Sequence, residues 1–116
     1  MVVDQLSDDE VDRLFHALAD ATRRDIVRRV LDGEQSISDL ARRYPMSMTA
    51  VQKHVSVLEG AGLVAKRRHG REQRVIGQVE AVQSAQRLLE DYERLWRDRF
   101  DRIGDLLAEP SQGDVR

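Results

Sequence analysis

The sequence predicts a small, mainly helical domain of the α+β class with one β-hairpin. Three observations support this prediction. Four segments with helical spacing of apolar residues each follow a Ser or Thr that can cap a helix. An arginine-rich hairpin is expected over residues 63–76, and a long amphipathic helix follows it. The predicted order, α-α-α-α-β-β-α, is that of a winged helix-turn-helix.

The first two helices are predicted from capping boxes. Ser7-Asp-Asp-Glu10 precedes an apolar stripe that begins at Val11, so a helix is expected over about residues 8–19. Thr22-Arg-Arg-Asp25 has the spacing of a second capping box, and Gly33 is expected to end the helix that follows it.

The next two helices form the predicted helix-turn-helix. Ser36-Ile-Ser-Asp39 begins a short helix that is expected to end near Tyr44, because the residue before Pro45 disfavours helical backbone angles. Ser47 is the expected N-cap of the next helix, over about residues 48–60.

The hairpin follows a predicted left-handed stop at Gly62. The strands are expected at Leu63-Val-Ala-Lys-Arg67 and Gln73-Arg-Val-Ile76. Between them lies His69-Gly-Arg-Glu72, where Gly70 can supply the positive φ that a hairpin turn often needs.

The final helix is expected from about Glu80 to Leu107, which at 1.5 Å per residue is roughly 40 Å. Its apolar stripe is longer than a small domain can cover, which predicts a partner, most simply the same helix of a second copy. Residues 1–109 are expected to form a single domain and residues 110–116 a disordered tail.

Composition excludes several functions. The 116-residue chain contains no cysteine, so it has no disulfide framework and no thiolate metal site. We find no signal peptide and no run approaching the roughly 20 apolar residues of a membrane span, so a cytoplasmic protein is expected. We also find no nucleophile with a base and orienter and no glycine-rich phosphate loop, so no enzymatic activity or cofactor is predicted.

Charge is distributed unevenly. The formal net charge is −2, but residues 34–74 hold 8 basic and 4 acidic side chains, which leaves +4 there and −6 elsewhere. Because salt screens charges beyond about 8 Å, the local excess is what meets phosphate. The modest total disfavours a protein that coats DNA nonspecifically.

The helix after Ser47 has two distinct faces. Val51, Val55 and Leu58 recur at i, i+4 and i+7 and are expected inside. The remaining side chains near its N-terminus suit a major groove: Gln52 for an adenine edge, and Lys53 for guanine or phosphate. The candidate DNA contacts on this helix are Ser47, Thr49, Ala50, Gln52, Lys53, His54 and Ser56. A merely solvated polar face is the alternative for this helix taken alone.

The basic hairpin favours DNA contact over that alternative. Five cations, Lys66, Arg67, Arg68, Arg71 and Arg74, lie in one stretch of nine residues that forms a projecting turn. This cluster favours phosphate or minor-groove contact.

The histidines are less informative. His54 is interpreted either as a phosphate donor or as a local packing residue. His69 is expected to be a turn residue and His16 a core-edge residue.

The sequence resembles the ArsR-type winged-helix repressors. The resemblance is carried by Leu14-Phe-His-Ala-Leu-Ala-Asp-Ala-Thr-Arg-Arg-Asp-Ile-Val27, by Met48-Thr-Ala-Val-Gln-Lys-His-Val-Ser-Val-Leu-Glu-Gly-Ala-Gly-Leu-Val64 and by Arg67-Arg-His-Gly-Arg71. It implies a homodimer that pairs through its first and last helices and represses by occupying a promoter. By position, it implies that Arg67, Arg68, Arg71 and Arg74 lie on the wing. The expected dimer contacts are Leu14, Leu89, Tyr92, Trp96 and Ile103.

The chain departs from the metal-sensing members of that family. Their Cys-x-Cys pair is replaced by Ser36-Ile-Ser-Asp39, and residues 80–107 contain no histidine. No metal site is therefore predicted, although a weak carboxylate site for hard cations is left open.

The leading hypothesis is a homodimeric, sequence-specific transcription regulator, most simply a repressor. It would bind double-stranded DNA at an inverted repeat through helix 47–60 and wing 63–76. The alternative is a winged-helix module that binds another protein. The sequence does not identify an effector.

Overall fold

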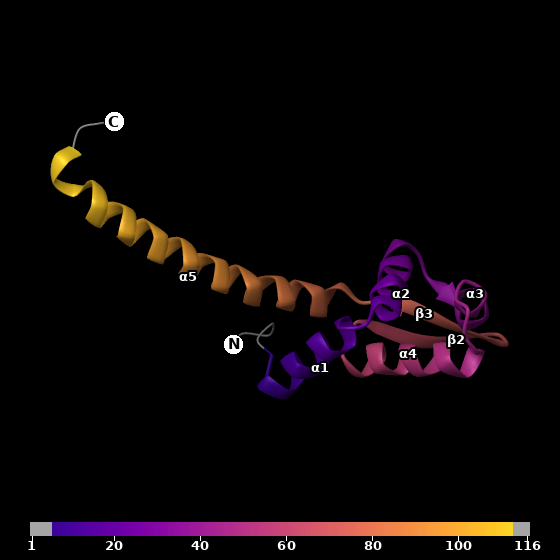
Figure 1. Ribbon diagram of the computed structural model, residues 1–116. Coiled ribbons are helices and arrows are strands. Elements are labelled where there is room, and N and C mark those ends of the chain that lie inside the picture. Colours follow the sequence, from indigo (N-terminus) through magenta and orange to yellow (C-terminus); the bar gives the residue numbers. More distant parts are fainter. Residues whose placement is uncertain (1–5, 113–116) are drawn as a thin grey trace. The chain divides into compact units, whose positions relative to one another are not determined.

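The structure, a computed structural model, describes residues 6–112 and the side chains of residues 6–107. Two compact units make up the chain, the first ending at Ala85 and the second beginning at Gln86. Eight elements follow one another along the described residues, and Figure 1 labels all of them except β1. They are α1 (Asp8–Leu18), α2 (Ala21–Asp32), β1 (Gln35–Ser36), α3 (Ile37–Ala41), α4 (Met48–Gly60), β2 (Val64–His69), β3 (Glu72–Gly77) and α5 (Val79–Gln112).

The first helix begins as predicted, but the cap of the second was assigned wrongly. The Ser7 hydroxyl accepts the Glu10 N–H and the Glu10 carboxylate accepts the Ser7 N–H, so both halves of the capping box form. The helix α2 instead begins after Asp20, whose carboxylate accepts the Arg23 N–H at 3.0 Å. Thr22 therefore lies inside the helix.

The next two helices have the predicted caps. The Ser36 hydroxyl accepts the Asp39 N–H, although α3 ends at Ala41, before the predicted Tyr44. The helix α4 ends at Gly60. Gly62 follows it at a φ of 78°, and the N–H groups of Gly62 and Leu63 donate to the carbonyls of Glu59 and Leu58 in the last turn.

The sheet has one strand more than predicted. Its order is β1-β3-β2, and every pair is antiparallel. The two residues of β1 pair with β3 and are too few to produce a strand pattern of their own. Gly70, at a φ of 64°, supplies the positive φ expected in the β2–β3 turn.

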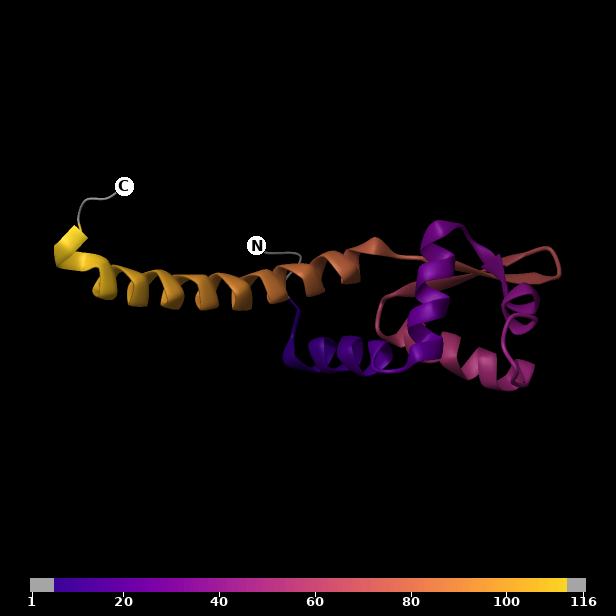
Figure 2. The same ribbon diagram turned by 45° about the horizontal axis from the view of Figure 1, so that its top comes forward.

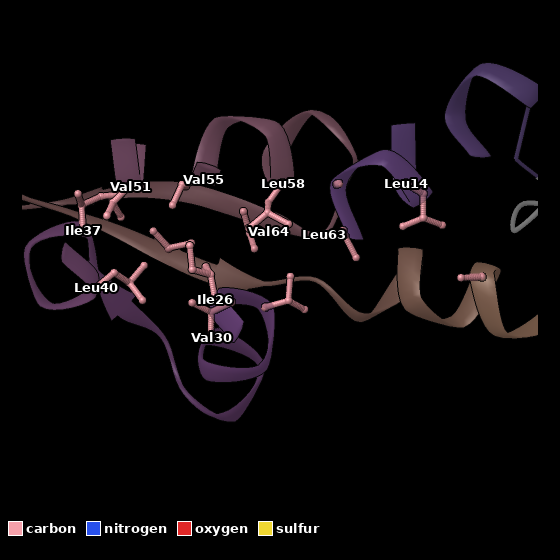
Figure 3. Packing of buried hydrophobic residues seen from close by; sticks show 14 residues of the cluster. Leu14, Ile26, Val30, Ile37, Leu40, Val51, Val55, Leu58, Leu63 and Val64 are labelled. Atoms are coloured by element: carbon pink, nitrogen blue, oxygen red, sulfur yellow. The ribbon is translucent and has the colours of Figure 1, made fainter. Parts of the chain in front are cut away.

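The core of the first unit is apolar and lies among α1–α4, the strands and the start of α5. Figure 3 shows Val55 and Leu58 of α4 facing the core that also holds Ile26 of α2. Leu14 joins this core at 1% exposure. Burying one such side chain stabilises the fold by about 1.5–3 kcal/mol, so this cluster fixes α4 against the rest of the unit.

Three segments lie at the same end of the first unit. In Figures 1 and 2 these are the start of α4, the helix α3 and the β2–β3 turn, and Figure 2 shows α3 between the other two. The N-terminus of α4 and the basic hairpin therefore share one end of the unit, although the two are separated in sequence.

The helix α5 is longer than predicted and runs through Gln112, beyond the expected end at Leu107. It therefore continues into the predicted tail, 110–116, of which residues 113–116 lie outside the described part of the chain. The prediction of a single domain over residues 1–109 stays a prediction.

Candidate nucleic-acid interface

The helix α4 divides its side chains between the core and solvent. Its N-cap, Ser47, accepts the Ala50 N–H at 3.0 Å, which leaves the first helical N–H groups at an exposed end. Val51, Val55 and Leu58 are fully buried. The predicted contact residues Ser47, Thr49, Gln52, Lys53 and Ser56 are exposed, and Ala50 is half-buried. The helix therefore presents small and hydrogen-bonding groups on a rigidly packed element.

His54 lies apart from this exposed face. Its Nδ1 is 3.2 Å from Nη1 of Arg23, and its side chain is 22% exposed. Because a guanidinium only donates hydrogen bonds, Nδ1 is the acceptor in this contact. A second neighbour, the Asp20 carboxylate, is 4.0 Å from the same nitrogen and would form an ion pair only with a protonated ring. This geometry favours the packing role over the phosphate role for His54.

Arg23 connects α4 to the corner between α1 and α2. Its Nε donates to the Ala17 carbonyl at 2.8 Å and its Nη2 to the His16 carbonyl at 3.1 Å. These carbonyls belong to the last turn of α1, where the usual i+4 partners are missing, and the His16 carbonyl also accepts the Ala19 N–H at 3.1 Å. The Arg23 backbone N–H also holds the pKa of Asp20 below its usual range. One side chain thus caps α1 and bonds to His54 of α4.

A second polar cluster fixes the turn before α4. The Tyr44 hydroxyl donates to Asp25 Oδ2 at 2.6 Å, and Arg29 Nε donates to the same oxygen at 2.8 Å. The Tyr44 hydrogen bond, followed by Arg29, lowers the pKa of Asp25. Burial, with Asp25 beside it, raises the pKa of Tyr44. These bonds connect the helix-turn-helix to α2.

The register of the hairpin sorts its cations between two faces. Lys66 is opposite Val75, Arg68 is opposite Gln73, and Arg67 is opposite Arg74. Directly opposed residues share a face and neighbours along a strand alternate. Because Val75 is fully buried, the face that carries Lys66 and Arg68 is the one turned toward the helices.

The wing arginines differ in what surrounds them. Arg67, Arg68 and Arg71 are exposed. Arg74 is only 30% exposed and pairs with Glu34 at 3.4 Å and Glu72 at 3.2 Å. Because Arg67 and Arg74 are like charges on opposed positions, these two carboxylates offset their repulsion. Arg74 therefore stabilises the hairpin, whereas the other three are available to a ligand.

A polar notch that the sequence prediction missed lies between α4 and the hairpin. Ile37, Gln52, Ser56, Lys66 and Gln73 line it. Gln73 was not among the predicted site residues, and only the strand register could have identified it. The turn fixes that register, which places Gln73 opposite Arg68.

The predicted dimer contacts separate into two groups. Leu14 lies in the core of its own chain. Leu89, Tyr92, Trp96 and Ile103 are 42–60% exposed on the second unit, where the rings of Trp96 and Phe100 stack at 5.6 Å. Leu14 is thus explained by core packing, and the other four leave an apolar helix face uncovered.

Within residues 6–112, no group of three or more His, Cys, Asp or Glu side chains is arranged to hold a metal ion. Among the helices that the structure describes, none has the length and apolar character to cross a membrane.

Comparisons with known proteins agree on one class. A family described as a helix-turn-helix domain matches residues 18–67. The HTH-type transcriptional regulator Rv2034 of Mycobacterium tuberculosis is 38% identical over 103 residues, which cover 89% of this chain and 92% of the relative.

Solved structures give the same result. An ArsR-like transcriptional regulator from Rhodococcus sp. RHA1 has a TM-score of 0.75 at 34% identity, over 88% of this chain and 95% of that chain. The homodimeric winged helix-turn-helix DNA-binding domain of Mb0332 from Mycobacterium bovis has a TM-score of 0.59 at 28% identity. The match covers 78% of this chain and 91% of that chain.

Proposed function

The chain belongs to the ArsR family of winged helix-turn-helix transcriptional regulators, and on that premise we propose that it is a homodimeric repressor of an inverted-repeat operator. In this proposal α4 reads bases in the major groove and the hairpin contacts the adjacent minor groove or its phosphates. Its site of action is the cytoplasm, where it would occupy a promoter.

One observation supports the proposal most strongly. The start of α4 and the β2–β3 turn lie at the same end of the first unit, with Thr49 and Gln52 exposed on the helix and Arg68 and Arg71 exposed on the hairpin. Small and amide side chains suit base edges, and arginines suit phosphates and narrow minor grooves. Buried apolar side chains hold α4 in place, so it presents these groups with little loss of conformational entropy on binding.

The dimer is inferred from α5. Leu89, Tyr92, Trp96, Ile103 and Leu107 follow helical spacings of three, four and seven residues and are 42–81% exposed. A continuous apolar face of this kind marks an interaction surface, and the related Mb0332 domain is homodimeric. Two copies related by a two-fold axis would read two half-sites whose centres are about one helical turn, 34–36 Å, apart.

Selection from genomic fragments tests the proposal. The purified protein would be mixed with fragments at physiological salt, and the enriched DNA would be footprinted. We expect a short protected inverted repeat upstream of a coding region, and lower transcription from that promoter when the protein is added in vitro.

Three other outcomes would count against it. Protection of a single half-site would contradict the dimer, and increased transcription would contradict repression. No enrichment over random DNA, together with a stable protein partner in a pull-down, would favour the winged-helix interaction module instead.

A further inference from the structure

The notch between α4 and the hairpin carries the hydrogen-bond donors and the cation of an anion site. Its volume is about 210 Å³, and its rim is polar on three elements: Gln52 and Ser56 of α4, Lys66 of β2 and Gln73 of β3. Ile37, at the start of α3, is its apolar contributor. A hydroxyl, two amides and an ammonium all supply donors.

The place of this notch in the proposed complex determines what would enter it. If α4 lies in a major groove and the hairpin in the neighbouring minor groove, the DNA strand that separates the grooves must pass between them. The notch lies between α4 and the hairpin, where that strand would pass. We propose that it seats one backbone phosphate of the operator, with Lys66 as its cation and Ser56 and Gln73 as hydrogen-bond donors. This inference rests on the proposed function and assigns Lys66 and Gln73 a role in it.

In the free protein Lys66 is held at the notch by weak contacts. Its Nζ is 3.4 Å from Ser56 Oγ and 3.4 Å from Glu59 Oε1, and its side chain is 29% exposed. Both distances exceed the 2.7–2.9 Å of strong charge-assisted bonds. Lys66 has one carboxylate partner, whereas Arg74 has two, so Lys66 can exchange its partners for a phosphate oxygen at a smaller cost than Arg74.

Glu59 has a double effect in this arrangement. Its carboxylate, 42% exposed, keeps the ammonium near the notch before DNA arrives. Once a phosphate is seated, the same carboxylate is a like charge beside it and weakens binding. Substitutions of Lys66 and Glu59 should consequently change DNA affinity in opposite directions.

The first test measures affinity against salt concentration with operator DNA selected by the wild-type protein. One phosphate contact contributes about 0.9 to the slope of log affinity on log salt, equivalent to about fivefold in affinity between 1 M and 0.15 M salt. Lys66→Met keeps the apolar stem. For each bound subunit, its salt slope should be shallower by about 0.9 and its affinity at 0.15 M salt should be about fivefold lower. Glu59→Gln should bind more tightly than wild type at 0.15 M salt. Arg94→Met is the matched control, because Arg94 is also an ion-paired cation, 2.7 Å from Asp91, but lies on α5.

A second test locates the contact on the DNA. Duplexes carrying one uncharged methylphosphonate at each position in turn would be bound to wild type and to Lys66→Met. The position facing the notch should weaken wild type and have no further effect on the variant, while other positions weaken both equally. Matching far-UV circular dichroism melts would show that the variants are folded.

The possible failures are distinguishable. An unchanged salt slope for Lys66→Met, or full sensitivity of that variant to every methylphosphonate, overturns the phosphate site while the DNA-binding proposal stands. If wild type binds no duplex more tightly than random DNA, the proposed function fails, and the inference fails with it.

Discussion

Replacing Arg23 should loosen the recognition helix without removing any group from the DNA face. The guanidinium donates to the carbonyls of His16 and Ala17 and to His54 Nδ1, at 3.1, 2.8 and 3.2 Å. Arg23→Ala deletes all three bonds at once. Because these bonds join α1 to α4, their loss should affect both stability and the placement of α4.

The magnitude follows from the number of bonds and their exposure. The bonds to Ala17 and His54 are part-buried and contribute about 1 kcal/mol net each, and the exposed bond to His16 contributes at most about 0.5 kcal/mol, so Arg23→Ala should lower the free energy of unfolding by about 2.5 kcal/mol. For a domain of this size that corresponds to a fall in melting temperature of roughly 10–20 °C. His54→Ala removes one of the three bonds and should cost about 1 kcal/mol. The double variant should show a coupling of about 1 kcal/mol between the two residues.

Arg24 supplies the matched control. It is the next residue on α2 and donates one exposed hydrogen bond, to the Leu18 carbonyl at 2.8 Å, so Arg24→Ala should change stability by at most about 0.5 kcal/mol. Urea unfolding at fixed protein concentration measures all four variants. DNA affinity of Arg23→Ala should fall with an unchanged salt slope, since no phosphate contact is lost. Equal destabilisation by Arg23→Ala and Arg24→Ala would refute the reasoning.

Three further predictions test other parts of the interface. Arg68→Ala should lower the salt slope of DNA binding by about 0.9 for each bound subunit. Arg74→Ala should leave the slope unchanged, because Arg74 already pairs with two carboxylates. Equal changes of the salt slope for the two variants in binding titrations would contradict this distinction. Ser47→Ala should destabilise the fold by about 1 kcal/mol, whereas Ser47→Asp should keep the cap in thermal melts yet weaken DNA binding in the same titrations, because it sets a negative charge against phosphate. The lowered pKa of Asp25 means that its charged form stabilises the fold above about pH 3.9, and that this stability is lost as the pH falls through the lowered pKa. Tyr44→Phe should therefore shrink the difference in melting temperature between pH 7 and pH 2, and an undiminished difference would contradict it.

Local signals predicted most of the helices. Ser7, Ser36 and Ser47 are followed three residues later by the N–H groups that they cap, and this relation depends on sequence spacing alone. The cap of α2 was misassigned because Asp20 and Thr22 both fit a capping pattern. The structure uses Asp20, whose carboxylate accepts the Arg23 N–H, while the Asp25 carboxylate accepts from Tyr44 and Arg29.

The remaining errors and omissions have tertiary causes. The strand β1 exists because two residues pair with β3, and the contact between Arg23 and His54 spans 31 residues. Neither leaves a periodic pattern in the sequence. Arg74 was grouped with the other wing arginines because sequence spacing does not show that Glu34 and Glu72 pair with it. The strand register brings Gln73 to the notch.

The central claim is that α4 reads bases while the hairpin holds the backbone. The most direct measurement compares wild type and Gln52→Ala on the selected operator and on a random duplex at 0.15 M salt. We predict that wild type binds the operator at least about 10³-fold more tightly. Gln52→Ala should lose roughly 1–3 kcal/mol on the operator and almost nothing on random DNA. Equal losses on the two duplexes would contradict the claim that this face of α4 reads sequence.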